Sequence, residues 1–406
     1  MTYVVVEGCG QWAMQYLEAL TEVAGSGEAG VFFTFDSTFG LENERLPVSL
    51  FKSYLEATLR NVERIEKAGF ACIDVKDTLY AVRGRSADNP NRQILPRRVD
   101  YVFVVTPDRT HCDVAEKWLG RARRIFVEKP FDLSERRIEA FIDQAAGSCT
   151  EVYALDHYFV RANHAAVDGG YYLAHLFGDG PAEITGFEFR MTEPCSDLAA
   201  VRERALSLQE GMVFDMGSHA IPILLPFLAP ETLRLLEASA GVSERLADLF
   251  FKGGDSFAAA VVEGTPPAGS GLLGTVRGTL AVGKDVGLRP EKWLKMQGLA
   301  GGICFDLANY TLDRLNPKGE VEESAGFLGE RWARFLVREF LAGRVPRAVS
   351  LFRPSGAQVV IRFLETWKRA CRNSAGLLAR YQAGTPTAQL VGDTRFKTMQ
   401  GVQHVR

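Results

Sequence analysis

The run GMVFDMGSH contains a carboxylate and an imidazole four residues apart, Asp215 and His219. If this run is helical, the two side chains lie on the same face of the helix. Histidine titrates near neutral pH, which suits a base that takes the proton from a hydroxyl group. Asp215 could orient the imidazole or hydrogen-bond a substrate. The alternative is an Asp–His pair that only stabilises a helix.

A second run, FVEKPF, ends an apolar segment with the charged pair Glu128 and Lys129, followed by Pro130. The proline favours an extended backbone at the lysine. A lysine at the end of a strand can donate a hydrogen bond to a substrate oxygen and stabilise the charge that develops on it. We therefore expect Lys129 to be a catalytic residue, and both Glu128 and Lys129 to lie beside a cofactor.

A turn rich in glycine, GCGQWA, lies between the first strand-like run and the first helix-like run. In such a turn the first glycine permits the sharp bend, the second lets the backbone approach a pyrophosphate, and the small third residue lets helix and strand pack closely. The start of the following helix attracts the anion. We expect a dinucleotide to contact Gly8, Gly10, Gln11, Trp12 and Ala13.

Two further positions fit a dinucleotide. Asp36 ends the second apolar run and has no arginine after it, which suits the free hydroxyls of an adenosine ribose and favours NAD over NADP. The run TPDRTH follows another strand-like run, so Thr106, Pro107 and His111 are expected to line the cofactor. Ligands of open α/β sheets bind beyond the carboxyl ends of the strands. The alternative for this run is a simple turn and helix start.

The order of expected elements supports this placement. Up to Leu155, apolar runs alternate with amphipathic helical runs, a pattern typical of a parallel, doubly wound sheet. Beyond it the rhythm changes to strand candidates with helices between and after them, which favours an open, largely antiparallel or mixed sheet. Those strand candidates are 183–191, 257–262, 272–282 and 302–307, and amphipathic helices are expected at 331–341 and 356–382.

Composition excludes several classes of protein. With 406 residues, 47% of them hydrophobic, the chain is long enough for two domains and is not disordered. A net charge of -3 gives no basic field for nucleic acid or anionic membranes, and no run is apolar enough to span a bilayer. Seven scattered cysteines without a Cys-x-x-Cys pair indicate reduced thiols in the cytoplasm and no metal site.

Together the four runs resemble the glucose-fructose oxidoreductase / inositol dehydrogenase / rhizopine-catabolism (Gfo/Idh/MocA) oxidoreductase family. The resemblance implies an α/β chain with an N-terminal Rossmann domain, residues 1–155. It also implies a C-terminal α+β domain, residues 156–406, that binds substrate and mediates oligomerisation. NAD or NADP is the implied cofactor, and Lys129 and His219 are the implied catalytic pair, assisted by Asp215. Many members have an aspartate where this chain has Pro222, so we expect its contacts to substrate hydroxyls to differ.

The run DHYFVR is similar to the Asp-His-Tyr-Leu-Gly-Lys signature of glucose-6-phosphate dehydrogenases. In that family the aspartate supports the catalytic histidine, and the His, Tyr and Lys contact the substrate. By this resemblance Asp156, His157, Tyr158 and Arg161 are candidate substrate-binding residues, with arginine replacing lysine. Taken from the residues alone, His157, Tyr158 and Arg161 form an anion-binding set at the end of a strand. The alternative is a buried His–Tyr pair at a domain junction.

We therefore expect a NAD(P)-dependent dehydrogenase or reductase acting on a carbinol or carbonyl carbon of a sugar, sugar phosphate or related polyol. Two alternatives stay open. One is an imine reductase of a biosynthetic pathway, whose site the region from Glu193 to Gln209 could shape. The other is a nucleotide-sensing binding protein without turnover. The expected partners are a small hydroxylated or anionic substrate and other copies of the chain in a homo-oligomer.

Overall fold

The computed structural model describes most of the chain, in twelve stretches. They are residues 2–24, 29–35, 47–74, 95–163, 182–204, 208–250, 253–270, 272–326, 332–350, 352–373, 377–385 and 387–390. The chain forms two compact units. The first contains residues 1–155 together with 197–207 and 330–358, and the second contains 156–196, 208–329 and 359–406. The sequence analysis places the segments 197–207 and 330–358 in the second domain, whereas in the structure they pack with the first.

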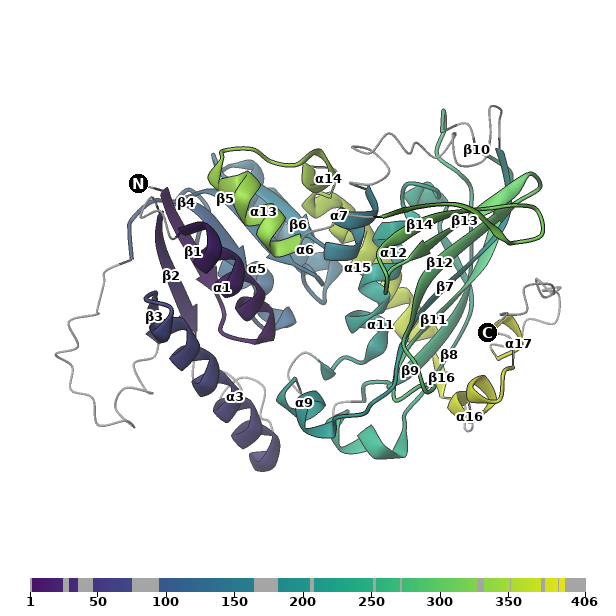
Figure 1. Cartoon of the computed structure of the whole chain (residues 1–406), viewed down its shortest axis with the longest axis horizontal. Helices are drawn as coiled ribbons and strands as arrows, with labels where there is room; N and C mark the ends of the chain where they lie inside the picture. The colour runs from purple at the N-terminus through teal and green to yellow at the C-terminus, as the bar shows by residue number, and fades with distance from the viewer. Residues whose placement is uncertain are drawn as a thin grey trace. The chain divides into compact units, whose positions relative to one another are not determined.

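The first unit is built on a six-stranded parallel sheet in the order β3-β2-β1-β4-β5-β6 (Figure 1). Its strands are β1 (Thr2–Glu7), β2 (Ala29–Phe35), β3 (Ala71–Asp74), β4 (Val99–Val104), β5 (Ala122–Glu128) and β6 (Glu151–Leu155). This is the strand order of a dinucleotide-binding doubly wound fold. The apolar runs form its centre because a parallel strand covered by helices is buried on both faces. The predicted Rossmann-type sheet is confirmed.

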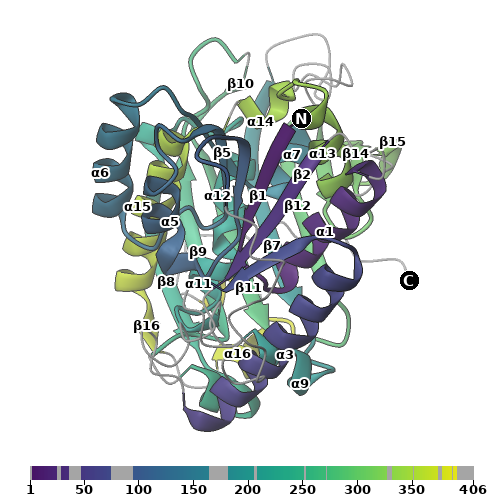
Figure 2. The same ribbon diagram turned by 90° about the vertical axis from the view of Figure 1, so that its left-hand side faces the viewer.

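Helices from distant parts of the chain belong to this unit. They are α1 (Gln11–Ala24), α3 (Val48–Lys67), η1 (Asp108–Thr110), α5 (His111–Glu116), α6 (Glu135–Ala146), α9 (Leu198–Glu203), α13 (Trp332–Leu341) and α14 (Arg347–Ser350). Figure 2 shows α13 beside α1, and the two helices meet through Trp332, whose ring centroid lies 5.9 Å from that of Tyr16. Phe340 of α13 stacks on Phe126 of β5, with centroids 4.0 Å apart. A late helix therefore covers the first sheet.

The second unit is built on a ten-stranded sheet whose main path is β15-β14-β13-β12-β7-β11-β9-β8-β16, with β10 paired to β7. Most neighbours are antiparallel, and the pairs β7–β11, β7–β10 and β8–β16 are parallel. The strands are β7 (Ala182–Glu193), β8 (Arg234–Gly241), β9 (Phe257–Gly264), β10 (Leu272–Leu273), β11 (Val276–Lys284), β12 (Glu291–Gly298), β13 (Gly301–Asp306), β14 (Thr311–Leu315), β15 (Val321–Gly326) and β16 (Arg372–Asn373). The predicted largely antiparallel sheet is confirmed.

Helices lie on both sides of this second sheet (Figure 1). The helices are α7 (His157–Asn163), α11 (Met212–Asp215), α12 (Gly217–Leu224), η3 (Pro230–Thr232), η4 (Glu244–Leu249), α16 (Leu377–Gln382) and α17 (Thr387–Leu390), while α15 (Pro354–Ala370) begins in the first unit and ends in the second. Leu377 and Tyr381 of α16 pack on Phe257, Ala259 and Val261 of β9. The C-terminal helices therefore bury part of the sheet face opposite α11 and α12.

Candidate active site

The glycine turn joins β1 to α1 and has the geometry that a pyrophosphate needs. Gly8 has a φ of +126°, and a Cβ there would lie 2.7 Å from the main-chain oxygen of Val105. Only glycine fits this close approach. Gly10 is exposed, and no described residue lies within 4 Å of the position its Cβ would take. Open space above a glycine, at the start of a 14-residue helix, fits the diphosphate of a dinucleotide.

Substitution of the two glycines is expected to affect different properties, fold stability at Gly8 and NAD binding at Gly10. Gly8→Ala is expected to destabilise the fold by about 2–4 kcal/mol, because the new methyl group collides with backbone at a positive φ. Gly10→Ala is expected to leave the melting temperature near wild type and to weaken NAD binding at least about tenfold, because its methyl group occupies the ligand's space. Thermal unfolding and NAD titration by tryptophan fluorescence measure both effects. Equal NAD affinity in Gly10→Ala and wild type would contradict the assignment of the turn.

His111 links the two loops that the sequence analysis assigns to the cofactor. Its Nδ1 lies 2.7 Å from the carbonyl oxygen of Pro130, and its Nε2 lies 2.7 Å from the carbonyl oxygen of Thr106. The ring is only 1% exposed. Burial lowers the pKa of His111, and the positive charge of Lys129 adds to this effect, while the two carbonyl contacts raise it. Both ring nitrogens of His111 contact backbone, so the residue joins the two loops. The cofactor contact expected of His111 stays a prediction.

Thr106 and Pro107 remain at the end of β4, where the sequence analysis places them. Both residues are partly exposed, and the hydroxyl groups of Thr106 and Thr110 lie 2.8 Å apart. The Thr110 hydroxyl donates to the carbonyl of Pro107 at 2.7 Å. Hydrogen bonds within the loop therefore fix its conformation. The loop lies at the carboxyl edge of the sheet, where a cofactor is expected. Asp36, the predicted ribose ligand, lies outside the described residues.

Glu128 and Lys129 differ sharply in their surroundings. The Glu128 carboxylate is buried and accepts a hydrogen bond of 3.0 Å from the hydroxyl of Tyr16 in α1. Burial and the nearby Glu128 charge raise the pKa of Tyr16 well above its ordinary value. Lys129 is half-buried, and its peptide bond to Pro130 is cis. Glu128 therefore ties β5 to α1, and Lys129 is the charged group that the strand end presents.

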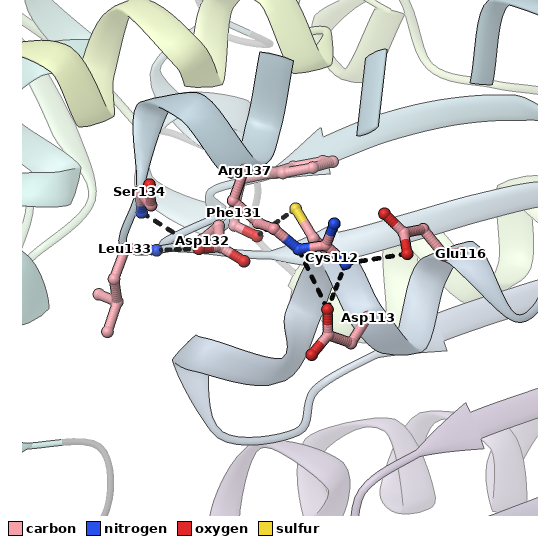
Figure 3. A network of polar contacts seen from close by, with 8 residues as sticks. All are labelled: Cys112, Asp113, Glu116, Phe131, Asp132, Leu133, Ser134 and Arg137. Atoms are coloured by element: carbon pink, nitrogen blue, oxygen red, sulfur yellow. Dashed lines mark hydrogen bonds and ion pairs between the residues drawn. The ribbon is translucent and has the colours of Figure 1, made fainter. Parts of the chain in front are cut away.

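The segment after Lys129 is anchored by a buried carboxylate (Figure 3). One oxygen of Asp132 accepts hydrogen bonds from the backbone N–H groups of Leu133 (2.7 Å) and Ser134 (3.1 Å), at the start of α6. Ser134 immediately precedes this helix, and its side chain makes no capping hydrogen bond. The Cys112 thiol contacts the carbonyl oxygen of Phe131 at 3.9 Å. Burial raises the pKa of both Asp132 and Cys112.

Figure 3 also shows ion pairs that connect α5 to α6. Arg137 of α6 pairs with Asp113 and, at 2.8 Å, with Glu116 of α5. These groups are partly exposed, so each pair adds little stability, about 0.2–1 kcal/mol. The ion pairs hold α5 and α6 together, and these two helices flank the segment that follows Lys129. The buried Asp132 fixes the backbone of that segment.

In the second unit, the predicted helix around His219 is two short helices. α11 ends at Asp215 and α12 begins at Gly217, so the pair does not share one continuous helix. The Nδ1 atom of His219 lies 2.5 Å from Oδ2 of Asp156, and both side chains are buried. The other oxygen of Asp156 accepts the N–H of Phe159 at 2.7 Å. Asp156 therefore holds the imidazole, the first of the two roles predicted for Asp215.

This geometry defines what His219 can do. A carboxylate only accepts hydrogen bonds, so Nδ1 of His219 carries the proton in this contact and the lone pair of the neutral ring lies on Nε2. A ring held in one tautomer by a buried aspartate is suited to general acid–base catalysis. Asp215 is also buried in this segment, and its carbonyl oxygen accepts a hydrogen bond of 3.0 Å from Ser218.

A capping residue from the loop before β9 determines where α11 begins. Oδ1 of Asp255 accepts the N–H groups of Met212 (2.9 Å) and Val213 (3.2 Å), and its Oδ2 lies 2.7 Å from the Lys368 ammonium. Gly211 has a φ of +87°, and a Cβ there would lie 2.4 Å from Asp255. The start of α11 therefore depends on contacts that sequence spacing does not reveal.

An aromatic cluster surrounds His219 within the second unit. The Tyr158 ring lies edge-on to the His219 ring, with centroids 4.8 Å apart, and the His157 ring lies 4.0 Å from that of Tyr158. The Arg161 guanidinium lies 3.8 Å from the ring centroid of Tyr310. Arg161 is 7% exposed, and its Nε and Nη1 have no hydrogen-bond partner among the described residues. A buried guanidinium with unsatisfied N–H groups is suited to bind an anionic ligand.

The structure adds three charged residues to this region that the sequence analysis did not single out. Glu193, at the end of β7, lies 2.6 Å from the Lys284 ammonium and also pairs with Lys292. Burial raises the pKa of Glu193, but the two lysines outweigh it and bring that pKa to about 2. The positive charge of Lys292 lowers the pKa of Tyr158, but burial outweighs it and raises that pKa to about 12. These residues lie on three strands, and no sequence motif connects them.

Comparison with known proteins agrees with this description. Residues 60–152 match the profile of a family described as "Oxidoreductase family, NAD-binding Rossmann fold", also called GFO_IDH_MocA. The match lies within the first unit. It confirms the predicted family resemblance, the Rossmann domain, an oxidoreductase enzyme and a cofactor of the NAD type. No curated protein matches the chain significantly.

Solved structures share the fold over nearly the whole chain. A UDP-N-acetylglucosamine 3-dehydrogenase from Acidithiobacillus ferrooxidans is 17% identical, with a TM-score of 0.56, and the match covers 91% of this chain and 97% of that one. A 3-ketoreductase from Actinomadura kijaniata in complex with NADP and TDP-benzene is 16% identical, with a TM-score of 0.59 and coverage of 92% and 98%. An oxidoreductase from Agrobacterium radiobacter in complex with NAD+, L-tartaric acid and magnesium is 14% identical, with a TM-score of 0.58 and coverage of 91% and 96%.

Two kinds of feature are absent from the described part of the chain. No described helix is both long and apolar enough to cross a membrane. No group of three or more His, Cys, Asp or Glu side chains in the described part of the chain could hold a metal ion. Homo-oligomerisation, a cytoplasmic location and the preference for NAD over NADP stay predictions.

Proposed function

We propose that this chain catalyses hydride transfer between a nicotinamide cofactor and a carbinol or carbonyl carbon of a sugar, sugar phosphate or related polyol. The observation that carries the proposal is the buried Asp156–His219 pair, because hydride transfer to or from such a carbon needs a group that moves the hydroxyl proton. The glycine turn supports dinucleotide binding in the first unit. The bound nicotinamide would supply the hydride chemistry itself.

Side chains of this protein are proposed to carry out the proton transfer and to stabilise the charge on the reacting oxygen. In the direction of oxidation, Nε2 of His219 accepts the hydroxyl proton, and the Asp156 carboxylate stabilises the resulting imidazolium. Lys129 donates a hydrogen bond to the same oxygen and stabilises the charge on it. Asp156 takes the role of orienting the imidazole ring. Asp215 is therefore assigned to bind a substrate hydroxyl. In the direction of reduction the same groups return the proton.

The substrate class follows from the second unit. His157, Tyr158 and Arg161 are proposed to bind the substrate, and the unsatisfied nitrogens of Arg161 favour one with an anionic group. Two proteins with the same fold also support an anionic substrate. One is named as a dehydrogenase of a UDP-sugar, and the structure of the other contains a TDP compound. A sugar that carries a phosphate or a nucleoside diphosphate fits both observations.

Arg161→Ala tests the anionic group. The variant is expected to lower kcat/KM for a phosphorylated sugar by about 10–100-fold and for the unphosphorylated sugar by less than about threefold, because a charge-assisted hydrogen bond is worth about 1.5–3 kcal/mol. Steady-state rates on the matched pair of sugars measure the difference. Equal losses on both sugars would remove Arg161 from anion binding.

The function itself is tested with the wild-type chain. NAD+ and NADP+ are offered with free sugars, sugar phosphates, UDP-sugars and TDP-sugars, and NAD(P)H formation is followed by absorbance. A thermal-shift screen of the same compounds runs in parallel, because a bound ligand raises apparent stability. Turnover of at least one sugar is the expected result. Cofactor binding without turnover of any compound would instead favour the nucleotide-sensing alternative.

A further inference from the structure

Tyr310 contacts two of the proposed substrate-binding residues from a distant part of the sequence. It immediately precedes β14, and its ring centroid lies 3.8 Å from the Arg161 guanidinium. The same ring stacks on that of Tyr158, with centroids 6.4 Å apart and an angle of 25° between the ring planes. Tyr158 and Arg161 are three residues apart on α7, so they are neighbours on one face of that helix. Tyr310 therefore packs against the face of α7 that carries both residues.

The backbone of Tyr310 has a conformation that is unusual for a tyrosine. Its φ is +57°, in the left-handed region where glycine and asparagine are common and a bulky side chain is rare. The turn that leads to it is well defined, because Oδ1 of Asp306 accepts the N–H groups of Ala308 (2.9 Å) and Asn309 (2.8 Å). A tyrosine at the end of such a turn indicates that the side chain has a role that glycine could not fulfil.

The Tyr310 ring holds the Arg161 guanidinium without using its hydrogen-bond donors. An aromatic face attracts a positive charge through its π electrons, whereas a carboxylate partner would accept hydrogen bonds from the guanidinium. Arg161 is 7% exposed, and its Nε and Nη1 have no hydrogen-bond partner among the described residues. The contact with Tyr310 therefore stabilises the buried charge and leaves these two donors available to a ligand.

We propose that Tyr310 is a positioning residue, which holds the Arg161 guanidinium so that its available N–H groups bind a phosphate group of the substrate. This inference rests on the proposed function and deepens it, because it names the residue on which anion binding by Arg161 depends. Phosphate oxygens accept strong, charge-assisted hydrogen bonds from a guanidinium. The Tyr158 ring contacts the rings of both Tyr310 and His219, so the phosphate would bind in the same cluster as the imidazole.

The first test observes Arg161 directly and needs no turnover, so it is independent of the proposed hydride transfer. The Nε–H resonance of Arg161 is identified in 1H–15N spectra as the one that Arg161→Lys lacks. Inorganic phosphate and inorganic pyrophosphate are then titrated separately into the wild-type protein. At least one of them is expected to shift this resonance, and the tighter of the two indicates whether the natural group is a monophosphate or a diphosphate. No shift with either anion would overturn the proposal.

Two substitutions then separate the ring from the rest of Tyr310. Tyr310→Phe keeps the aromatic face and is expected to bind the anion within about twofold of wild type. Tyr310→Gly removes the ring but suits a φ of +57°, so its melting temperature is expected to stay near wild type. Its dissociation constant for the anion is expected to rise at least about fivefold. An unchanged dissociation constant in Tyr310→Gly, or equal losses in the two variants, would overturn the proposal. If Tyr310→Gly is unfolded, Tyr310→Asn takes its place.

The second test is a double-mutant cycle on the phosphorylated sugar that wild type turns over. Tyr310→Gly is expected to lower kcat/KM for this sugar at least about fivefold, and Tyr310→Phe is expected to restore it. The double variant with Arg161→Ala is expected to lose no more than Arg161→Ala alone, because Tyr310 acts through the guanidinium that is already gone. Losses that multiply would overturn the proposal. If no sugar is turned over, the proposed function fails, and the NMR titration still decides the role of Tyr310.

Discussion

Replacing Asp156 with asparagine is expected to lower kcat by about two to four orders of magnitude while the protein stays folded and binds NAD normally. The amide has nearly the shape of the carboxylate, so it fits the buried position next to Nδ1 of His219. It carries no charge to stabilise the imidazolium. It can also turn its NH2 group toward the ring, which places the proton on Nε2 and leaves no base facing the substrate.

The matched control for this prediction is Asp215→Asn. Both aspartates are buried in the same unit, but Asp156 makes the contact with the imidazole. If Asp215 binds a substrate hydroxyl, Asp215→Asn should mainly raise KM, by about tenfold, with a smaller effect on kcat. Steady-state kinetics and circular dichroism on the two variants separate the roles. A loss in kcat confined to Asp215→Asn would show that Asp215, and not Asp156, serves the imidazole.

The first sheet could be predicted because its signals are local. Each strand is a short apolar run, most strands are followed by a helix among the described residues, and right-handed connections then determine which strands are neighbours. The location of α13 could not be predicted in this way. Its apolar face shows that the helix is buried, but nothing in the sequence says that Trp332 packs on Tyr16. That contact joins residues more than three hundred positions apart.

Several strands of the second sheet also escaped the sequence analysis. β12 (Glu291–Gly298), β14 (Thr311–Leu315) and β15 (Val321–Gly326) contain many charged residues, because few of their described positions are buried. In β12 the buried residues Leu294 and Met296 alternate with Lys295 and the partly exposed Trp293. An alternation this short and this polar is hard to distinguish from a loop. Lys292 was overlooked for the same reason.

At the candidate site, sequence spacing identified the histidine but not its partner. The i, i+4 rule requires a continuous helix, and here the helix is interrupted at Met216. The resemblance through the run at Asp156 pointed to the aspartate that the structure places on Nδ1 of His219. His111 shows the opposite difficulty. Its position in a loop beyond a strand predicts a ligand contact, and only the structure shows that both of its ring nitrogens contact backbone carbonyl groups.

Replacing Lys129 with methionine is expected to lower turnover by about three orders of magnitude and to leave NAD binding near wild type. Methionine keeps much of the aliphatic chain but cannot donate a hydrogen bond or carry charge. Loss of one donor to a developing oxyanion costs about 100–1,000-fold in kcat, and loss of the positive charge adds to it. NAD binding is expected to persist, because the diphosphate is assigned to the turn at Gly8 and Gly10.

Lys117→Met is the control, because Lys117 is an exposed lysine of the same unit and its loss should leave kcat unchanged. A second readout is a stopped-flow measurement in the direction of reduction, which starts from the reduced cofactor deuterated at C4 of the nicotinamide. If Lys129 acts on the chemical step, the isotope effect on kcat should grow in Lys129→Met, since hydride transfer becomes slower than product release. Wild-type rates in Lys129→Met would remove this lysine from the mechanism and leave proton transfer to His219 alone.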